Sequence, residues 1–141
     1  MAVISINGQG PPPDVIVEGG VLDVTSNLDL YNLEVLATGV LQIRSGVTLT
    51  IHGHYTNDGD FMGDGSTVAF AGSTNQTLAG SNLSFYNLRI SKLSGDAVLN
   101  NPLTVNNSLT LGLGHIDLGN NDLSMGTATL SGESSSGYLK T

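Results

Sequence analysis

Short apolar runs, separated by Gly, Asn, Asp and Ser, recur along the chain from Val15 onward. Within many runs apolar and polar residues alternate, as in Val47–Ile51, where Val, Leu and Ile are separated by Thr. A period of two indicates a β-strand, because successive side chains of a strand point to opposite faces. Helical spacing is not sustained over any window of about 11 residues, and glycine recurs too often for helices. The pattern therefore predicts an all-β protein.

Two architectures accept many short strands, namely an antiparallel sandwich or barrel and a parallel β-solenoid. The runs here are shorter than the roughly 5–6 residues typical of sandwich strands, and about three of them fit in a 20-residue coil. We therefore expect a single-stranded parallel β-helix (β-solenoid) of about six coils. Its strands would be formed by Val15–Val17, Val21–Val24, Leu28–Leu30, Leu33–Leu36, Val40–Ile43, Val47–Ile51, Thr67–Phe70, Phe85–Ile90, Ala97–Leu99, Leu103–Val105, Leu109–Leu111, Ile116–Leu118, Leu123–Met125 and Thr127–Leu130.

The sequence also divides the chain and assigns its core. Residues 1–14 are predicted to form an N-terminal arm or cap, because Pro11–Pro13 favour an extended segment, and residues 15–141 form the solenoid. Asparagine pairs are expected at corners, since Asn tolerates the left-handed conformation and its side chain hydrogen-bonds turns; they are Asn100-Asn101, Asn106-Asn107 and Asn120-Asn121. The residues expected inside are Leu49, Ile51, Leu88, Ile90, Leu103, Val105, Leu109 and Leu111.

One stretch of sequence returns later in the chain. Leu30–Val35 reads LYNLEV, and Phe85–Ile90 reads FYNLRI. Similar apolar runs follow both stretches, with spacing that slips by a few residues. We interpret the pair as a supra-repeat of about two to three coils.

The net charge of the chain restricts the classes of molecule that it can bind. The chain has 4 Lys and Arg against 12 Asp and Glu, a formal charge of −8. Nucleic acid is not expected as a partner, because binding phosphates needs clustered cations, and an anionic membrane surface is disfavoured for the same reason. Membrane insertion is not expected either, since no apolar run approaches about 18 residues. There is no Cys, so stability must come from packing.

The densest acidic stretch, residues 57–65, is the candidate metal site. Asp58, Asp60 and Asp64 offer the hard oxygens that Ca²⁺ prefers, although the spacing is not that of an EF-hand. A solvated turn between coils is the alternative interpretation. His52 and His54 would point the same way on a strand and could hold a transition metal, but no third ligand is evident. No other cofactor is expected.

Two further functions remain open for a solenoid. A carbohydrate-active enzyme needs paired carboxylates in a groove, for which Asp58, Asp60, Asp117 and Asp122 are available without a motif that pairs them. An ice-binding solenoid needs flat rows of threonine. The available threonines are Thr48, Thr50, Thr104, Thr110, Thr127 and Thr129, and outward β-propensity also explains them.

Residues 65–111 contain the sequence motifs TVAFAGSTNQTLAG, FYNLRISK and VLNNPLTVNNSLTL. This segment resembles repetitive stalk and adhesin regions of large Bacteroidetes surface proteins, which are often type IX secretion cargo and carry TVxFxGxxxQTIxG, FYNLxIxK and VxLNNPLTVNGxLTL. The resemblance covers roughly residues 28–141 and implies a spacer or display shaft without catalytic residues. Such proteins carry a signal peptide and a sorting domain, which are not recognised here. The chain would lack these two segments if it were an excised part of such a protein, or a phage fibre protein built from similar coils.

These observations lead to one functional expectation. We expect a non-catalytic structural or adhesive module that serves as a rigid shaft or spacer on a cell or virion surface, and thus an extracellular location. An uncapped solenoid exposes unpaired strand edges at its ends, so we expect self-association or docking into a larger assembly. Carbohydrate is a further candidate partner.

Overall fold

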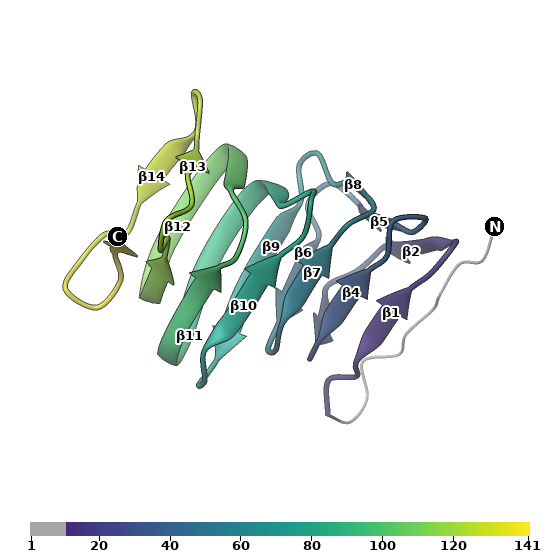
Figure 1. The fold of residues 1–141 in the computed structure, drawn as a ribbon, viewed down its shortest axis with the longest axis horizontal. Helices are drawn as coiled ribbons and strands as arrows, with labels where there is room; N and C mark the ends of the chain where they lie inside the picture. The colour runs from purple at the N-terminus through teal and green to yellow at the C-terminus, as the bar shows by residue number, and fades with distance from the viewer. Residues whose placement is uncertain (1–10) are drawn as a thin grey trace.

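The structure, a computed structural model, describes residues 11–141 of the chain. This part contains strands and no helix, and hence no helix long and apolar enough to cross a membrane. Its strands stack side by side along one axis, from β1 at one end to β14 at the other (Figure 1). All ladders between the named strands are parallel, which confirms the predicted β-solenoid and its about six coils. Of the predicted arm, residues 1–10 lie outside the described part.

Each of the first three coils contributes three short strands. The strands of the chain are β1 (Val15–Val17), β2 (Val21–Val24), β3 (Leu28–Leu30), β4 (Leu33–Val35), β5 (Val40–Ile43), β6 (Thr48–Ile51), β7 (Tyr55–Asn57), β8 (Asp60–Met62), β9 (Thr67–Gly72), β10 (Gln76–Ala79), β11 (Ser84–Leu99), β12 (Leu103–Asp117), β13 (Leu123–Ser124), β14 (Thr129–Ser131) and β15 (Leu139–Lys140). β11 and β12 join runs that the sequence predicted as separate strands, because their ladder continues around the corners through register shifts.

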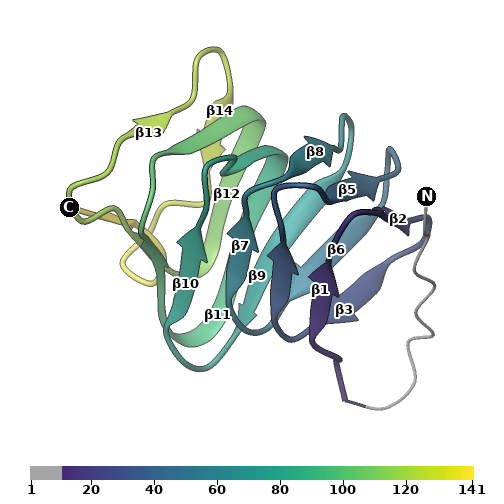
Figure 2. The same ribbon diagram turned by 45° about the vertical axis from the view of Figure 1, so that its right-hand side comes forward.

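The stacked strands form three faces of a prism (Figure 2). The first face holds β1, β4, β7, β10, the ends of β11 and β12, and β15. The second face holds β2, β5 and β8, and continues after a break with the starts of β11 and β12 and with β13. The third face holds β3, β6, β9, the middle of β11 and β12, and β14. We call the turn from the third face into the next coil's first face the third corner.

The core is one column of aliphatic side chains that point inward from all three faces. The eight residues that the sequence assigned to the interior are all buried, which confirms the inward assignment. In the third and fourth coils four rings fill the column, with centroids 5.3–6.0 Å apart. They belong to Tyr55, Phe61, Phe70 and Phe85. Burial of such rings contributes strongly to the stability of a core.

Polar side chains at the corners connect successive coils. Asp14 Oδ1 accepts the main-chain N–H of Asn32 (3.1 Å), and Asn32 Oδ1 accepts that of His54 (2.6 Å). His54 Nδ1 in turn accepts the N–H of Thr77 (2.9 Å). Among the predicted asparagine pairs, Asn101 Oδ1 accepts the N–H of Gly80 (2.9 Å) and Asn121 Nδ2 donates to the carbonyl oxygen of Leu99 (2.8 Å), so asparagine side chains hydrogen-bond the corners as predicted. Left-handed asparagine is not seen, because every residue with positive φ in the described part is glycine.

The sequence repeat does not mark equivalent positions in successive coils. Leu33–Val35 forms β4 on the first face, whereas Leu88–Ile90 lies in β11 and pairs with β9 on the third face. The two stretches lie between two and three coils apart, as predicted, but at corners between different faces, so their displacement is not a whole number of coils. Leu30–Val35 spans the third corner between β3 and β4, whereas Phe85–Ile90 lies within β11, at the bend marked by the register shift between Phe85 and Asn87.

Candidate functional site

The three aspartates predicted to bind calcium lie at different points of the third coil. Asp58 Oδ1 accepts the main-chain N–H of Ser81 (2.8 Å), so this carboxylate connects two coils as the corner asparagines do. Asp60 begins β8, and Asp64 lies in the turn after it; all three are exposed. Within residues 11–141 no three His, Cys, Asp or Glu side chains form a group that could hold a metal ion. Calcium binding stays a prediction without a geometric site.

The two histidines lie in the third corner after β6, not on the strand as predicted, because β6 ends at Ile51. His52 Nε2 lies 3.1 Å from Asp29 Oδ2 in the coil before. His54 Nδ1 accepts a hydrogen bond from the main-chain N–H of Thr77 in the next coil. Each ring therefore contacts a different neighbouring coil, and both act as connections between coils.

The carboxylates available to an enzyme are split between two places. Asp58 and Asp60 lie in the third coil, whereas Asp117 and Asp122 flank the corner three coils further on. Three coils correspond to roughly 14 Å along the axis, because parallel strands are about 4.8 Å apart. A pair of glycosidase carboxylates lies about 5–9.5 Å apart, so the two places do not form one such pair.

Outward-pointing side chains, most of which carry hydroxyl groups, form two rows on the third face. One row consists of Thr48, Thr67, Asn87, Ser108 and Thr129. The other consists of Asp29, Thr50, Ala69, Arg89, Thr110 and Ser131. The predicted threonine ladder thus exists in part, but Thr104 lies on the second face and Arg89 interrupts the hydroxyl pairs.

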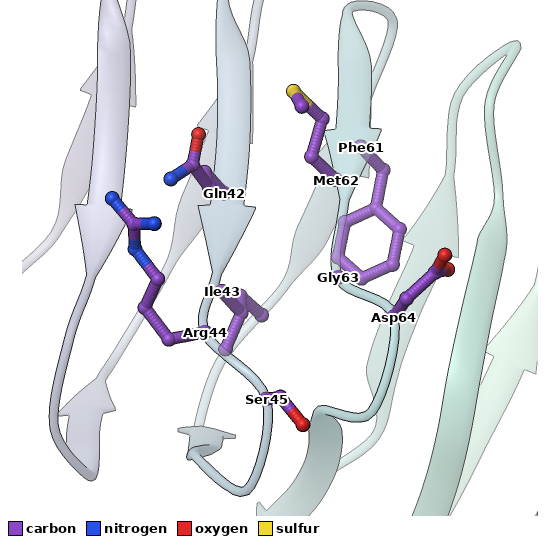
Figure 3. Close-up of a pocket in the computed structure, with 8 residues that line it drawn as sticks. All are labelled: Gln42, Ile43, Arg44, Ser45, Phe61, Met62, Gly63 and Asp64. Carbon is purple, nitrogen blue, oxygen red and sulfur yellow. The ribbon is translucent and has the colours of Figure 1, made fainter.

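A concavity of about 510 Å³ lies on the second face, over β5 and β8 (Figure 3). Arg44 and Asp64 lie on opposite sides of it. Arg44 donates two hydrogen bonds to Asp23, at 2.9 and 2.8 Å, and these bonds hold the pKa of the Asp23 carboxyl below its usual value. Since Asp23 already neutralises the guanidinium, Arg44 offers little charge to a ligand in this concavity.

The third corner of the last three coils brings together a cluster of charged side chains. Asp96 Oδ2 accepts from Lys140 Nζ (2.6 Å), and Asp96 Oδ1 lies 3.0 Å from His115 Nδ1. Both contacts, with that of Lys140 first, hold the pKa of the Asp96 carboxyl below its usual value. The ring of Tyr138 packs against that of His115, with centroids 4.1 Å apart and the ring planes tilted by 48°. Perturbed titratable groups gathered beside a concavity indicate a functional site.

Sequence reasoning missed this cluster, although a signal was present. Asp96, His115 and Tyr138 each follow a glycine and precede an inward apolar residue, in the segments GDA, GHI and GYL. These segments are aligned in successive coils. A search for residues that follow glycine at coil intervals would have found them.

A buried lysine lies close to this cluster. Lys92 is 1% exposed, and its Nζ donates to the carbonyl oxygen of Thr74 (2.8 Å) and to Gln76 Oε1 (2.6 Å). Gln76 Nε2 donates in turn to the carbonyl oxygens of Ile51 and Gly53 in the coil before. Burial lowers the pKa of the Lys92 ammonium. The chain of hydrogen bonds therefore fastens three coils together inside the third corner.

Comparisons with known proteins add no relative: no family model, no curated protein and no solved structure matches the chain.

Proposed function

We propose that the protein is a non-catalytic structural and adhesive module, a rigid shaft or spacer whose coils stack end to end with those of a second copy. The support is the last coil. Leu109 and Leu130 occupy the same inward column, yet Leu109 is 0% exposed and Leu130 is 38% exposed. Within residues 11–141 the strands β13, β14 and β15 pair with β12 alone, so their outer edges have no ladder partner.

The geometry of the coils favours a head-to-tail contact between copies. Every coil already binds the next through parallel ladders on its faces, and the outermost coil offers the same ladder edges. Leu118, Leu123, Met125, Ala128 and Leu139 are only partly buried there. A first coil of another copy would pair these edges and cover these side chains, and a heterologous contact of this kind extends into a filament.

This role agrees with the resemblance to stalk regions of Bacteroidetes surface proteins, and with a fibre on a virion. We accordingly propose an extracellular, cell-surface or virion-surface location. Ice binding and polysaccharide chemistry are weaker candidates. Arg89 interrupts the hydroxyl rows of the third face, and the aspartates available to an enzyme lie in separate coils.

Sedimentation velocity over a range of concentrations tests the proposal. The wild-type chain is expected to gain mass as its concentration rises, and more so at high salt, because salt screens the repulsion between copies of charge −8. Leu130→Lys should weaken this association. Met62→Lys, which alters an exposed apolar residue of the second face, should not. A monomer at every concentration, or equal effects of both substitutions, would refute the stacking.

A further inference from the structure

Two exposed leucines flank a concavity at the third corner of the fourth to sixth coils. Leu93 is 83% exposed and Leu113 is 47% exposed, and both line a hollow of about 330 Å³. Apolar surface gains free energy when it is covered, so a ligand seated between these leucines would be stabilised by contact with both. Asp96, His115 and Ser136 line the same hollow, so its apolar sides enclose polar groups.

The polar groups of the hollow include both hydrogen-bond donors and acceptors. A carboxylate only accepts, so the contact between Asp96 and His115 Nδ1 places the hydrogen on that nitrogen. Nε2 of this ring has no hydrogen-bond partner among residues 11–141, so it can take part in a contact with a ligand. The Ser136 hydroxyl, which both donates and accepts, likewise has no partner within that range.

Contacts from outside the hollow fix these groups in place. Lys140 holds the second oxygen of Asp96, and the ring of Tyr138 packs against that of His115. Gly114 has a φ of +89°, and a Cβ atom there would lie 2.8 Å from Lys92 Cβ, so the main chain directly after Leu113 closely approaches the preceding coil. Because packing and hydrogen bonds already hold these groups, a ligand can bind without the entropic cost of ordering them.

We propose that this hollow binds a neutral saccharide. Sugars present an apolar face of C–H groups and a rim of hydroxyls that both donate and accept, which matches two leucines beside a serine, a histidine and a carboxylate. The volume lies at the lower end of the range for small-molecule sites, enough for one or two sugar rings. An anionic ligand is disfavoured by Asp96 and by the chain's net charge. The inference rests on the adhesive part of the proposed function.

Amide NMR spectra of the full chain, recorded with maltose, cellobiose, lactose and N,N′-diacetylchitobiose, test the site. At least one of these sugars is expected to shift the amide signals of Gly95, Gly114 and His115 saturably. The double variant Leu93→Ala, Leu113→Ala should weaken that binding roughly tenfold, as the loss of two apolar contacts predicts. Tyr31→Ala, an exposed side chain in another part of the solenoid, serves as the control and should bind as the wild type does.

The inference would be overturned if none of the four sugars shifted these amide signals. It would also be overturned if the double leucine variant bound a sugar as tightly as the wild type. Both variants alter exposed side chains, so their amide spectra should keep the wild-type dispersion and establish that they are folded. Their self-association in sedimentation should also be unchanged. If the protein self-associates but binds no sugar, only the saccharide site is contradicted. If it binds sugar but does not self-associate, only the stacking of copies is contradicted.

Discussion

Lys140 Nζ lies 2.6 Å from Asp96 Oδ2, so the last strand of the solenoid is tied by a charged hydrogen bond to the coil two turns before it. Asp96 also holds His115, in the coil between them. One carboxylate therefore connects three successive coils at the end where β15 has a single neighbouring strand. This contact adds to the ladders and apolar side chains that hold the last coil.

This carboxylate should make the stability of the protein depend on pH. Because the pKa of Asp96 is lowered in the folded state, its contribution is present above the unfolded value of about 3.9 and is lost as the pH falls through the folded value. We expect Asp96→Asn to be less stable than the wild type at pH 6, and the difference to shrink on acidification below about pH 4. Urea unfolding at a series of pH values measures this. A difference that stays constant across the range would contradict the role of the ionised carboxylate.

Truncation of the core should be costly. Leu103→Ala is expected to lower the free energy of unfolding by about 2–5 kcal/mol, because Leu103 is fully buried and its neighbours fill the cavity only in part. Leu93→Ala is the matched control, since Leu93 is the most exposed leucine of the described part, and it should change stability by less than about 0.5 kcal/mol. Equal unfolding midpoints for Leu103→Ala and the wild type would refute the inward assignment.

The corner histidine should be replaceable by asparagine. His54 Nδ1 accepts the N–H of Thr77, as Asn32 Oδ1 accepts the N–H of His54 one coil earlier. His54→Ala is expected to cost about 1 kcal/mol, the usual net value of such a hydrogen bond, whereas His54→Asn should keep most of it. Thermal unfolding of both variants decides this. If the two variants lose the same stability, the side-chain acceptor is not what connects these coils.

Gly80 and Gly119 both have positive φ but differ in the space around them. A Cβ atom on Gly80 would overlap the carbonyl oxygen of Asn57 in the coil before, whereas Gly119 has no atom within 4 Å. Gly119→Ala should therefore cost only the backbone strain of about 1–2 kcal/mol. Gly80→Ala should cost more, because two coils must also move apart. Chemical unfolding of the two variants compares them, and an equal loss would show that the coils are less closely stacked there.

Period-two alternation made most of this fold predictable from sequence. Leu49 and Ile51, or Leu109 and Leu111, can point inward together only on a strand, and the short runs between glycines limit the strand length. The choice of corner was not predictable, because Leu30–Val35 and Phe85–Ile90 look alike while they lead between different faces. Local sequence specifies that a corner forms, and the register of the neighbouring coil decides where it lies.

The candidate sites were predicted less well, for a physical reason. Asp58, His52 and His54 were judged by their neighbours in sequence, yet their partners Ser81, Asp29 and Thr77 lie one coil away. The Asp96 cluster was missed for the same reason. In a solenoid the chemistry of a side chain depends on residues about 20 positions before and after it.

Disulfide trapping between copies tests the head-to-tail stacking most directly. The outward row that runs through Thr110 and Ser131 on the third face would continue into Asp29 of the next copy, about 4.8 Å away, within the range that a disulfide spans. The chain has no Cys, so Asp29→Cys with Ser131→Cys introduces a single pair. On mild oxidation this variant is predicted to form a ladder of covalent dimers, trimers and longer species. Asp29→Cys with Thr110→Cys, one coil further in, should not. A monomeric double variant, or an equal ladder from the control, would contradict the end-to-end stacking.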